Sequence, residues 1–280
     1  MDALRAGLLA DQVAVVSGGG SGIGRATALE LARLGAKVVV CGRRLEPLQE
    51  TAALADPASV HAIACDIREE DQVDELVAAT LARHGRIDIL VNNAGGQFLC
   101  PAENITAKGF RAVVRLNLEG TWLMTHAVAT KAFIPSGRGG RVVSVTLTPH
   151  TGLAGMAHSS AARAGVENLM KVLAIEWARF DINLVAVAPG VVGTDTFFTK
   201  YPKEIVEHAA TGLLAGELTT PEEVAQTIAF IVSPAGRGIS GSVVNVDRGH
   251  DVSQARWPPE AIRADDGAYP QEARREPNPT

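Results

Sequence analysis

Short apolar runs alternate along the chain with longer segments in which apolar residues recur every three or four positions. The short runs are rich in β-branched residues, which is typical of buried parallel strands, and the longer spacing is typical of helices. We predict strands at residues 13–16, 38–40, 60–64, 87–91, 142–145, 184–187 and 242–246, and helices at residues 23–34, 70–84, 112–132, 160–180 and 222–232. Parallel neighbours need crossover connections, so this alternation predicts an α/β fold with a doubly wound parallel sheet.

Length and composition limit the function classes. The 280 residues are 46% hydrophobic and 20% charged, which indicates one soluble, ordered domain. A net charge of −5 without any run of Lys or Arg argues against a nucleic-acid partner. No apolar run reaches the roughly 18 residues of a membrane helix, and Asp2 and Asp11 interrupt the start, so we expect no membrane partner and a cytoplasmic location. Cys41, Cys65 and Cys100 lack metal-site spacing, which indicates free thiols and no metal.

The composition changes near the C-terminus. Residues 251–280 hold five of the fourteen prolines and mixed charge, so we predict a domain over residues 1–250 and an irregular tail over 251–280. The last predicted helix follows Thr219-Thr220-Pro221, a cap followed by a proline. The final residues, Asn278-Pro279-Thr280, are not a peroxisomal address, which agrees with the cytoplasmic prediction.

A glycine-rich segment, residues 17–24, links the first predicted strand to the first predicted helix. Gly18 permits a tight turn, Gly22 lets the backbone approach phosphates, and Gly24 lets helix and strand pack closely. This strand–turn–helix context favours a dinucleotide pyrophosphate at the start of the helix, and therefore a single Rossmann-type domain.

The end of the second strand bears on which dinucleotide binds. A site specific for NAD places a carboxylate there to bind the ribose hydroxyls, but this chain has Gly42. Arg43 and Arg44 follow directly, and their permanent positive charges suit a 2′-phosphate. The sequence therefore predicts NADPH as the cofactor, and the alternative interpretation is a solvated basic pair in a loop.

These motifs together resemble the short-chain dehydrogenases/reductases over residues 8–250. The resemblance rests on the glycine loop, Asp66-Ile67, Asn92-Asn93-Ala94-Gly95, Asn117 and Pro189-Gly190. It implies a cofactor site formed by Gly18, Ser21, Gly22, Ile23, Gly24, Arg43, Arg44, Asp66, Ile67, Asn93, Ala94, Gly95, Arg163, Pro189, Gly190, Val192 and Thr194. It also implies a homotetramer and a lid over residues 194–215 that covers an apolar acyl chain.

The chain departs from that family at two catalytic positions. The family's Tyr-x-x-x-Lys motif falls on Ser159 and Arg163, and the following Ala164-Gly165-Val166 sets the register. A serine hydroxyl is a far weaker acid than the tyrosine that protonates an alkoxide. Arg163 can orient the nicotinamide ribose but cannot act as an acid at neutral pH. Ordinary carbonyl reduction is therefore disfavoured.

A closer resemblance is to the peroxisomal-type trans-2-enoyl-CoA reductases and the related dienoyl-CoA reductases. It rests on Gly95-Gly96-Gln97-Phe98-Leu99, residues 158–166 and Glu176-Trp177-Ala178. It implies that Gln97 donates a hydrogen bond to a thioester carbonyl. The family's catalytic serine aligns with Thr146 or Leu147. Reduction of a conjugated double bond needs such donors, because they stabilise the enolate oxygen while the proton goes to carbon.

We therefore predict an NADPH-dependent reductase acting on the α,β double bond of an enoyl-CoA-like thioester, with catalytic residues Ser159, Arg163, Gln97, Asn117 and Thr146. Asn117 matches an asparagine that in the family kinks a helix and binds a water. One alternative is a carbonyl or imine reductase whose acid is His158 or Tyr201. Another is an inactive NADPH-binding protein that has lost the tyrosine and the lysine. We interpret His150 and His158 as structural hydrogen-bonding residues.

Overall fold

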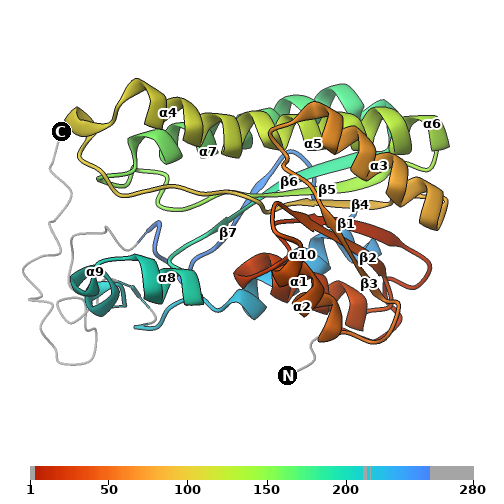
Figure 1. The fold of residues 1–280 in the computed structure, drawn as a ribbon, viewed down its shortest axis with the longest axis horizontal. Coiled ribbons are helices and arrows are strands. Elements are labelled where there is room, and N and C mark those ends of the chain that lie inside the picture. The colour runs from red at the N-terminus through yellow and green to blue at the C-terminus, as the bar shows by residue number, and fades with distance from the viewer. Residues whose placement is uncertain (1–3, 211–212, 215, 253–280) are drawn as a thin grey trace, which may run out of the picture.

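A seven-stranded parallel sheet runs through the centre of the molecule in the order β3-β2-β1-β4-β5-β6-β7 (Figure 1). The computed structural model describes residues 4–210, 213–214 and 216–252, so the predicted tail lies outside the described residues after Val252. The strands are β1 (Val13–Ser17), β2 (Lys37–Gly42), β3 (Val60–Ala64), β4 (Ile89–Asn92), β5 (Gly140–Val145), β6 (Ile182–Pro189) and β7 (Val243–Val246). The doubly wound sheet predicted from the sequence is confirmed.

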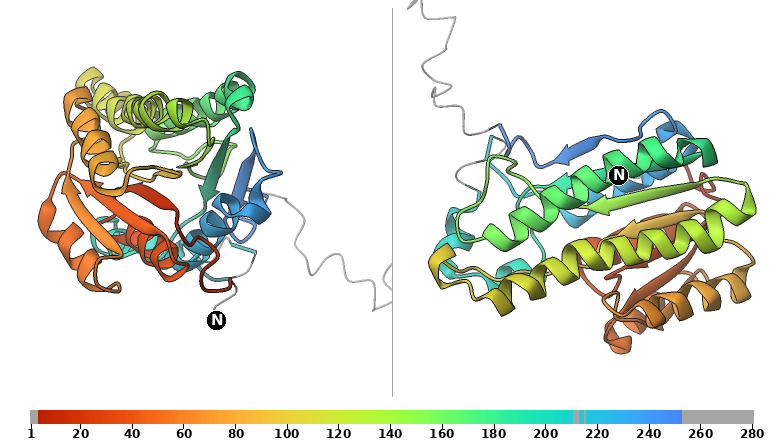
Figure 2. Two further views of the ribbon diagram at one scale, coloured as in Figure 1. Left: turned by 90° about the vertical axis from the view of Figure 1, so that its right-hand side faces the viewer. Right: turned by 90° about the horizontal axis from the view of Figure 1, so that it is seen from above.

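Helices cover both faces of the sheet (Figures 1 and 2). One layer contains α1 (Gly22–Arg33), α2 (Leu45–Ala53) and α10 (Pro221–Val232). The other contains α3 (Glu70–His84), α4 (Ala107–Val114), α5 (Gly120–Val128), α6 (Ile134–Ser136) and α7 (Ala157–Trp177). Each layer buries its own apolar cluster against the sheet. None of the helices in the described part of the chain has the length and apolarity needed to cross a bilayer.

The predicted helix at residues 112–132 differs from the structure. The observed helical run extends from Ala107 to Ser136 and contains two π-helical turns, Arg115–Glu119 and Ala129–Phe133. The Asn117 side chain donates to the carbonyl of Val113 (2.8 Å), four residues earlier, within the first π turn. A π turn inserts a residue into the helical repeat, so apolar spacing alone does not reveal the full extent of such a helix.

Two shorter elements show what local sequence signals capture. α2 was not predicted, because only Leu48 and Thr51 of its nine residues are buried and Pro47 stands in its first turn. α10 begins as predicted. The Thr220 hydroxyl accepts from the amide of Glu223 (3.2 Å), and the Glu223 carboxylate accepts from the amide of Thr220 (2.8 Å), a complete capping box.

The strand order reverses direction between β1 and β4. In an open parallel sheet the loops that leave two such strands diverge, which opens a crevice at the carboxyl edge. The short helices α8 (Asp195–Lys200) and α9 (Lys203–His208) lie beyond this edge (Figure 1). The fold therefore places the glycine loop, the segment after β4 and the start of α7 around one opening.

Candidate active site

The glycine loop between β1 and α1 forms a backbone cradle. Gly18 and Gly22 have φ of +67° and +50°, in the left-handed region that favours glycine. A Cβ on Gly24 would lie 2.2 Å from the carbonyl oxygen of Gly18, so α1 can lie this close to the loop only with glycine there. The unpaired amides at the N-terminus of α1 border the loop, an arrangement that fits a pyrophosphate.

A cleft of about 300 Å³ lies beside the loop. Its lining includes the predicted cofactor residues Gly18, Ser21, Gly22, Ile23, Arg43, Asp66, Ile67, Asn93, Ala94, Gly95 and Thr194. Cys65, Leu116 and Thr196 line it too, and nothing in their local sequence marks them as cofactor residues. The structure thus brings together the segments that follow β1, β2, β3, β4 and β6.

The other predicted cofactor residues do not line this cleft. Arg44 is exposed at the N-terminus of α2. Pro189 ends β6, and Gly190 packs on Asp247, where a Cβ would approach the Asp247 Cβ to 2.9 Å. Val192 forms an isolated β-bridge with Thr219. These last three residues shape the segment between β6 and α8, and their cofactor contacts stay a prediction.

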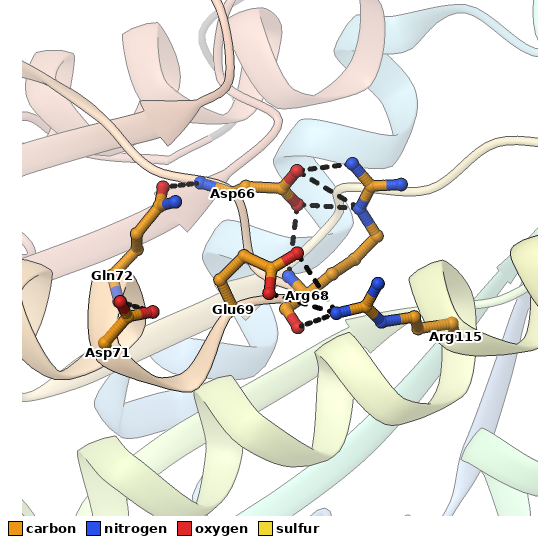
Figure 3. Close-up of polar contacts among 6 residues, drawn as sticks. All are labelled: Asp66, Arg68, Glu69, Asp71, Gln72 and Arg115. Carbon is orange, nitrogen blue, oxygen red and sulfur yellow. Dashed lines mark hydrogen bonds and ion pairs between the residues drawn. The ribbon is translucent and has the colours of Figure 1, made fainter.

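Charged side chains of the segment after β3 form a hydrogen-bonded network with Arg115 (Figure 3). The Asp66 carboxylate accepts two hydrogen bonds from Nε of Arg68 (2.9 and 3.1 Å) and one from its Nη2. Hydrogen bonding by Arg68 holds the pKa of Asp66 below its ordinary value, with a smaller contribution from the charge of Arg43. Arg115 extends the network by donating to Glu69 (3.0 Å) and to the carbonyl of Arg68 (3.1 Å). Asp66 is therefore ionised and fixed in place.

Two asparagines hold the segment after β4. The Asn93 amide side chain donates to the carbonyl of Ser17 (3.0 Å), which ties this segment to β1. The fully buried Asn117 donates to the carbonyl of Gly96 (2.8 Å) and accepts from its amide (3.2 Å). The Asn117 side chain also donates to the carbonyl of Val113, so these three hydrogen bonds all go to backbone groups. The geometry supports a positioning role for Asn117, which fixes the loop that carries Gly95 and Gln97.

The start of α7 carries buried polar atoms without partners. Arg163 is 7% exposed, donates from Nη1 to the carbonyl of Val145 (2.5 Å), and has no partner at Nε. No carboxylate of the described residues pairs with it, and burial lowers its pKa to about 10, so it stays a cation at neutral pH. The hydroxyl of Ser159, one turn earlier, is fully buried and also unpartnered. Such groups are costly unless a ligand satisfies them, so they fit hydroxyl or enolate oxygens of bound molecules.

The Arg163 guanidinium lies against the segment after β4. A Cβ on Gly95 would come within 2.1 Å of Nη2 of Arg163 and within 2.6 Å of Oδ1 of Asn117. Gly95 also lines the dinucleotide cleft. Arg163 therefore lies directly behind the cleft wall, where the sequence predicts the nicotinamide ribose.

The other candidate acids have defined contacts. The ring of His158 is fully buried, accepts at Nδ1 from the amide of Ser159 (2.8 Å), and packs edge-on against Phe98 at 4.3 Å between centroids. Acceptance at Nδ1 places the ring proton on Nε2, which has no partner. Gln97 donates to the Tyr201 hydroxyl (3.1 Å) between α8 and α9. The predicted lid segment thus touches the predicted thioester donor.

A second polar group surrounds Thr146, one residue beyond β5. Its hydroxyl donates to Oε1 of Glu167 on α7 (2.9 Å), and the same oxygen is 3.1 Å from Nε2 of His150. Nδ1 of His150 is 2.8 Å from the carboxylate of Asp251. While Glu167 is ionised, Thr146 points its proton at this carboxylate, which argues against the simple oxyanion-donor role predicted for Thr146.

Comparisons with known proteins show the family of this chain. Residues 18–251 match the family model described as enoyl-(acyl carrier protein) reductase. A probable 2,4-dienoyl-CoA reductase of Bacillus subtilis (strain 168) is 34% identical over 243 residues, covering 84% of this chain and 94% of that protein. The peroxisomal 2,4-dienoyl-CoA reductase of Arabidopsis thaliana is 31% identical over 278 residues, covering 95% of this chain and 93% of that protein. The chain belongs to the short-chain dehydrogenase/reductase family.

Solved structures support the same assignment. The citronellol catabolism dehydrogenase of Pseudomonas aeruginosa PAO1 superposes with a TM-score of 0.79 at 40% identity, covering 89% of this chain and 98% of that chain. Short-chain dehydrogenases/reductases bind nicotinamide cofactors, and the cleft beside the glycine loop is where we predict the cofactor of this chain. The family membership also makes the serine and arginine at positions 159 and 163 a departure from the family's tyrosine and lysine.

Proposed function

We propose that this protein uses NADPH to reduce the α,β double bond of an enoyl-CoA-like thioester. The observation that carries the proposal is the start of α7, where buried Ser159 and Arg163 replace the tyrosine and lysine that carbonyl reduction requires. Oγ of Ser159 and Nε of Arg163 are buried without a partner, and Arg163 lies against Gly95 of the cleft lining. This site is better suited to binding a developing enolate than to protonating an alkoxide. The dienoyl-CoA reductases among the relatives support the broader class, reduction of a double bond conjugated with a thioester.

Each part of the site would have a distinct task. NADPH, when bound, supplies a hydride to the β-carbon of the substrate. Arg163 would orient the nicotinamide ribose through its free Nε and stabilise negative charge nearby. Ser159 and Gln97 would donate hydrogen bonds to the thioester oxygen, on which the enolate charge develops. For Gln97 this requires exchanging its contact with Tyr201 for one with substrate.

The choice of NADPH rests on the end of β2. Gly42 offers no carboxylate to a ribose, and Arg43 lines the cleft with an exposed guanidinium. The nearest carboxylate of the cleft, Asp66, is held by Arg68. A 2′-phosphate at this place would meet a cation and no free carboxylate, which favours NADPH over NADH.

Two predictions, about oligomeric state and cellular location, accompany this function. We propose a homotetramer, for which the exposed apolar side chains Val172 and Ile175 on the outside of α7 are the support, Ile175 being 80% exposed. We also propose a cytoplasmic location. Light scattering of the purified protein tests the first, and fractionation of the source cells tests the second.

The test is NADPH consumption by purified protein with trans-2-enoyl-CoA and 2,4-dienoyl-CoA esters of several chain lengths, beside a panel of ketones. Saturable thioester turnover is expected, and it should fall in Ser159→Ala. Ser160→Ala is the matched control, because Ser160 is the next residue and also has a buried, unpartnered hydroxyl. Turnover of ketones alone would refute double-bond reduction. Tight NADPH binding without turnover of any acceptor would identify an inactive dinucleotide-binding protein.

A further inference from the structure

Four polar side chains from three segments of the chain form a continuous hydrogen-bonded line next to the proposed site. It runs from Thr146 after β5, through Glu167 on α7 and His150 in the loop after Thr148, to Asp251 after β7. The successive distances are 2.9, 3.1 and 2.8 Å. Asp251 also accepts from the amide of His150 (2.6 Å), which fixes the orientation of the ring. None of the described His, Cys, Asp and Glu side chains group so as to hold a metal ion, so the line is a hydrogen-bond network.

The line connects the protein interior with solvent. Thr146 is 4% and Glu167 8% exposed, whereas the His150 side chain is 34% exposed. At its inner end, the carbonyl of Val145 holds Nη1 of Arg163, so Thr146 is the residue next to the one that anchors this guanidinium. The inner end therefore lies beside the proposed catalytic groups, and the outer end can exchange protons with water.

The charges around His150 favour its protonated form. Burial lowers its pKa, but the hydrogen bond to Asp251 and the charge and hydrogen bond of Glu167 together raise it above the ordinary value. The other polar groups at this place are Asn245 of β7, which donates to Asp251 (3.1 Å), and Asp247, which accepts from the Asp251 amide (2.7 Å). α7 carries two cations one turn from Glu167, Arg163 before it and Lys171 after it.

We propose that His150 and Glu167 form a proton relay that delivers, through the hydroxyl of Thr146, the proton that the reaction requires at the substrate α-carbon. This inference rests on the proposed function, in which hydride addition leaves an enolate that needs one proton. The proposed function by itself names no donor for that proton.

Protons and charges balance in this relay without any further reagent. Nε2 of His150 gives its proton to Oε1 of Glu167, so the imidazolium becomes neutral and the carboxylate becomes a carboxylic acid. The acid then donates to Oγ of Thr146, while the Thr146 O–H bond breaks and its proton forms the new C–H bond at the α-carbon. Glu167 returns to its carboxylate form, the enolate charge is neutralised, and His150 takes a new proton from solvent.

The same geometry explains why the threonine hydroxyl can change direction. Oε1 of Glu167 accepts from both Thr146 and His150 in the structure. Once that oxygen carries a proton, it donates instead of accepting. The Thr146 hydroxyl can then turn its own proton away from Glu167, and in the proposed relay the substrate α-carbon competes for this proton with the carbonyl of Val187, 3.3 Å from Oγ1. The protonation state of Glu167 thus decides whether Thr146 can act as a donor.

The first test needs no substrate. Nuclear magnetic resonance of protein with ¹⁵N-labelled histidine reports the pKa of His150 in the wild type, in Glu167→Gln and in Asp251→Asn. We expect the pKa to fall in both variants, because each loses a carboxylate next to the ring. An unchanged pKa in both variants would overturn the relay whatever the enzyme reduces.

The second test is the pH profile of kcat. The wild-type rate should fall as the pH rises through the pKa of His150, because the relay then lacks its proton. His150→Gln should lower kcat by about 100-fold or more and lose this dependence, while the Kd of NADPH stays within about twofold. Asp251→Asn keeps the histidine ring and should move the fall in kcat to lower pH. This variant provides the test if His150→Gln does not fold. The control is His126→Gln, since His126 is exposed on α5 and stacks on Trp122.

The outcomes separate the relay from the proposed function. Thioester turnover with an unchanged pH profile in His150→Gln and Asp251→Asn refutes the relay and leaves the proposed function standing. A merely structural role for His150 would lower the melting temperature and would keep the profile. Turnover of ketones alone refutes the proposed function, and the profile measured with the ketone then decides whether the relay operates. Absence of any turnover in the wild type refutes both.

Discussion

Replacing Gly95 with alanine should damage both the stability and the cofactor site. A Cβ at this position would lie 2.1 Å from Nη2 of Arg163, 2.6 Å from Oδ1 of Asn117 and 3.1 Å from Cζ of Arg163. Neither the Arg163 nor the Asn117 side chain can move aside freely. Arg163 is held by the carbonyl of Val145 (2.5 Å), and Asn117 is held by both backbone groups of Gly96.

The size of the stability loss follows from which side chains must move. Overpacking a filled site costs about 1 to 3 kcal/mol. Losing the hydrogen bond of the buried Arg163 cation adds about 1.5 to 3 kcal/mol. The free energy of unfolding of Gly95→Ala should therefore fall by roughly 2.5 to 6 kcal/mol. At about 2 to 4 °C per kcal/mol for a domain of this size, the melting temperature drops by roughly 5 to 24 °C.

Urea unfolding followed by circular dichroism measures this loss, and NADPH fluorescence titration measures the binding. The matched control is Gly96→Ala in the same loop, where a Cβ would only approach the flexible end of Leu116 at 3.3 Å. We expect the control to stay within about 1 kcal/mol of the wild type. Equal stability and equal NADPH affinity in Gly95→Ala and the wild type would refute the close packing of Arg163 behind the cleft.

Three further predictions test single groups. Ser159→Ala removes a buried hydroxyl without a partner, so the free energy of unfolding should stay level or rise by about 1 kcal/mol while thioester turnover falls; a large loss of stability would show that the hydroxyl has a structural partner. Arg43→Gln should raise the Kd of NADPH about tenfold and leave that of NADH unchanged in fluorescence titrations, and equal effects on both cofactors would argue against a 2′-phosphate contact. The pKa of His150 is raised on folding, so the stability it contributes is complete below its unfolded pKa and is lost as the pH rises through the folded pKa. Urea unfolding over a pH series should show this loss in the wild type and not in His150→Gln.

Features that depend on a few neighbouring residues could be predicted from the sequence. The glycine loop and the cap at Thr220 before Pro221 belong to this class. Their signals are local because backbone conformation at a turn or cap is decided within a few residues. The resemblance implied a kink at Asn117, but the extent of the π turns Arg115–Glu119 and Ala129–Phe133 leaves no distinct pattern in apolar spacing.

The contacts of charged side chains could not be predicted in the same way. Asp66 and Arg68 are two residues apart, yet their pairing depends on the turn that follows β3. His150 and Asp251 are separated by 101 positions and meet only because the segments after β5 and β7 lie at the same edge of the sheet. Asp251 was assigned to an irregular tail, and the structure instead packs this first tail residue against the domain.

The sequence by itself determined that this protein is a short-chain dehydrogenase/reductase with an intact dinucleotide loop and without the tyrosine and lysine of the family. Those are statements about which residue types stand at which positions. Only the tertiary structure decided that Arg163 is a buried cation without a carboxylate partner among the described residues, and that the Thr146 hydroxyl points at Glu167. Desolvation and hydrogen-bond direction depend on every element packed around a group, so no local pattern could have fixed them.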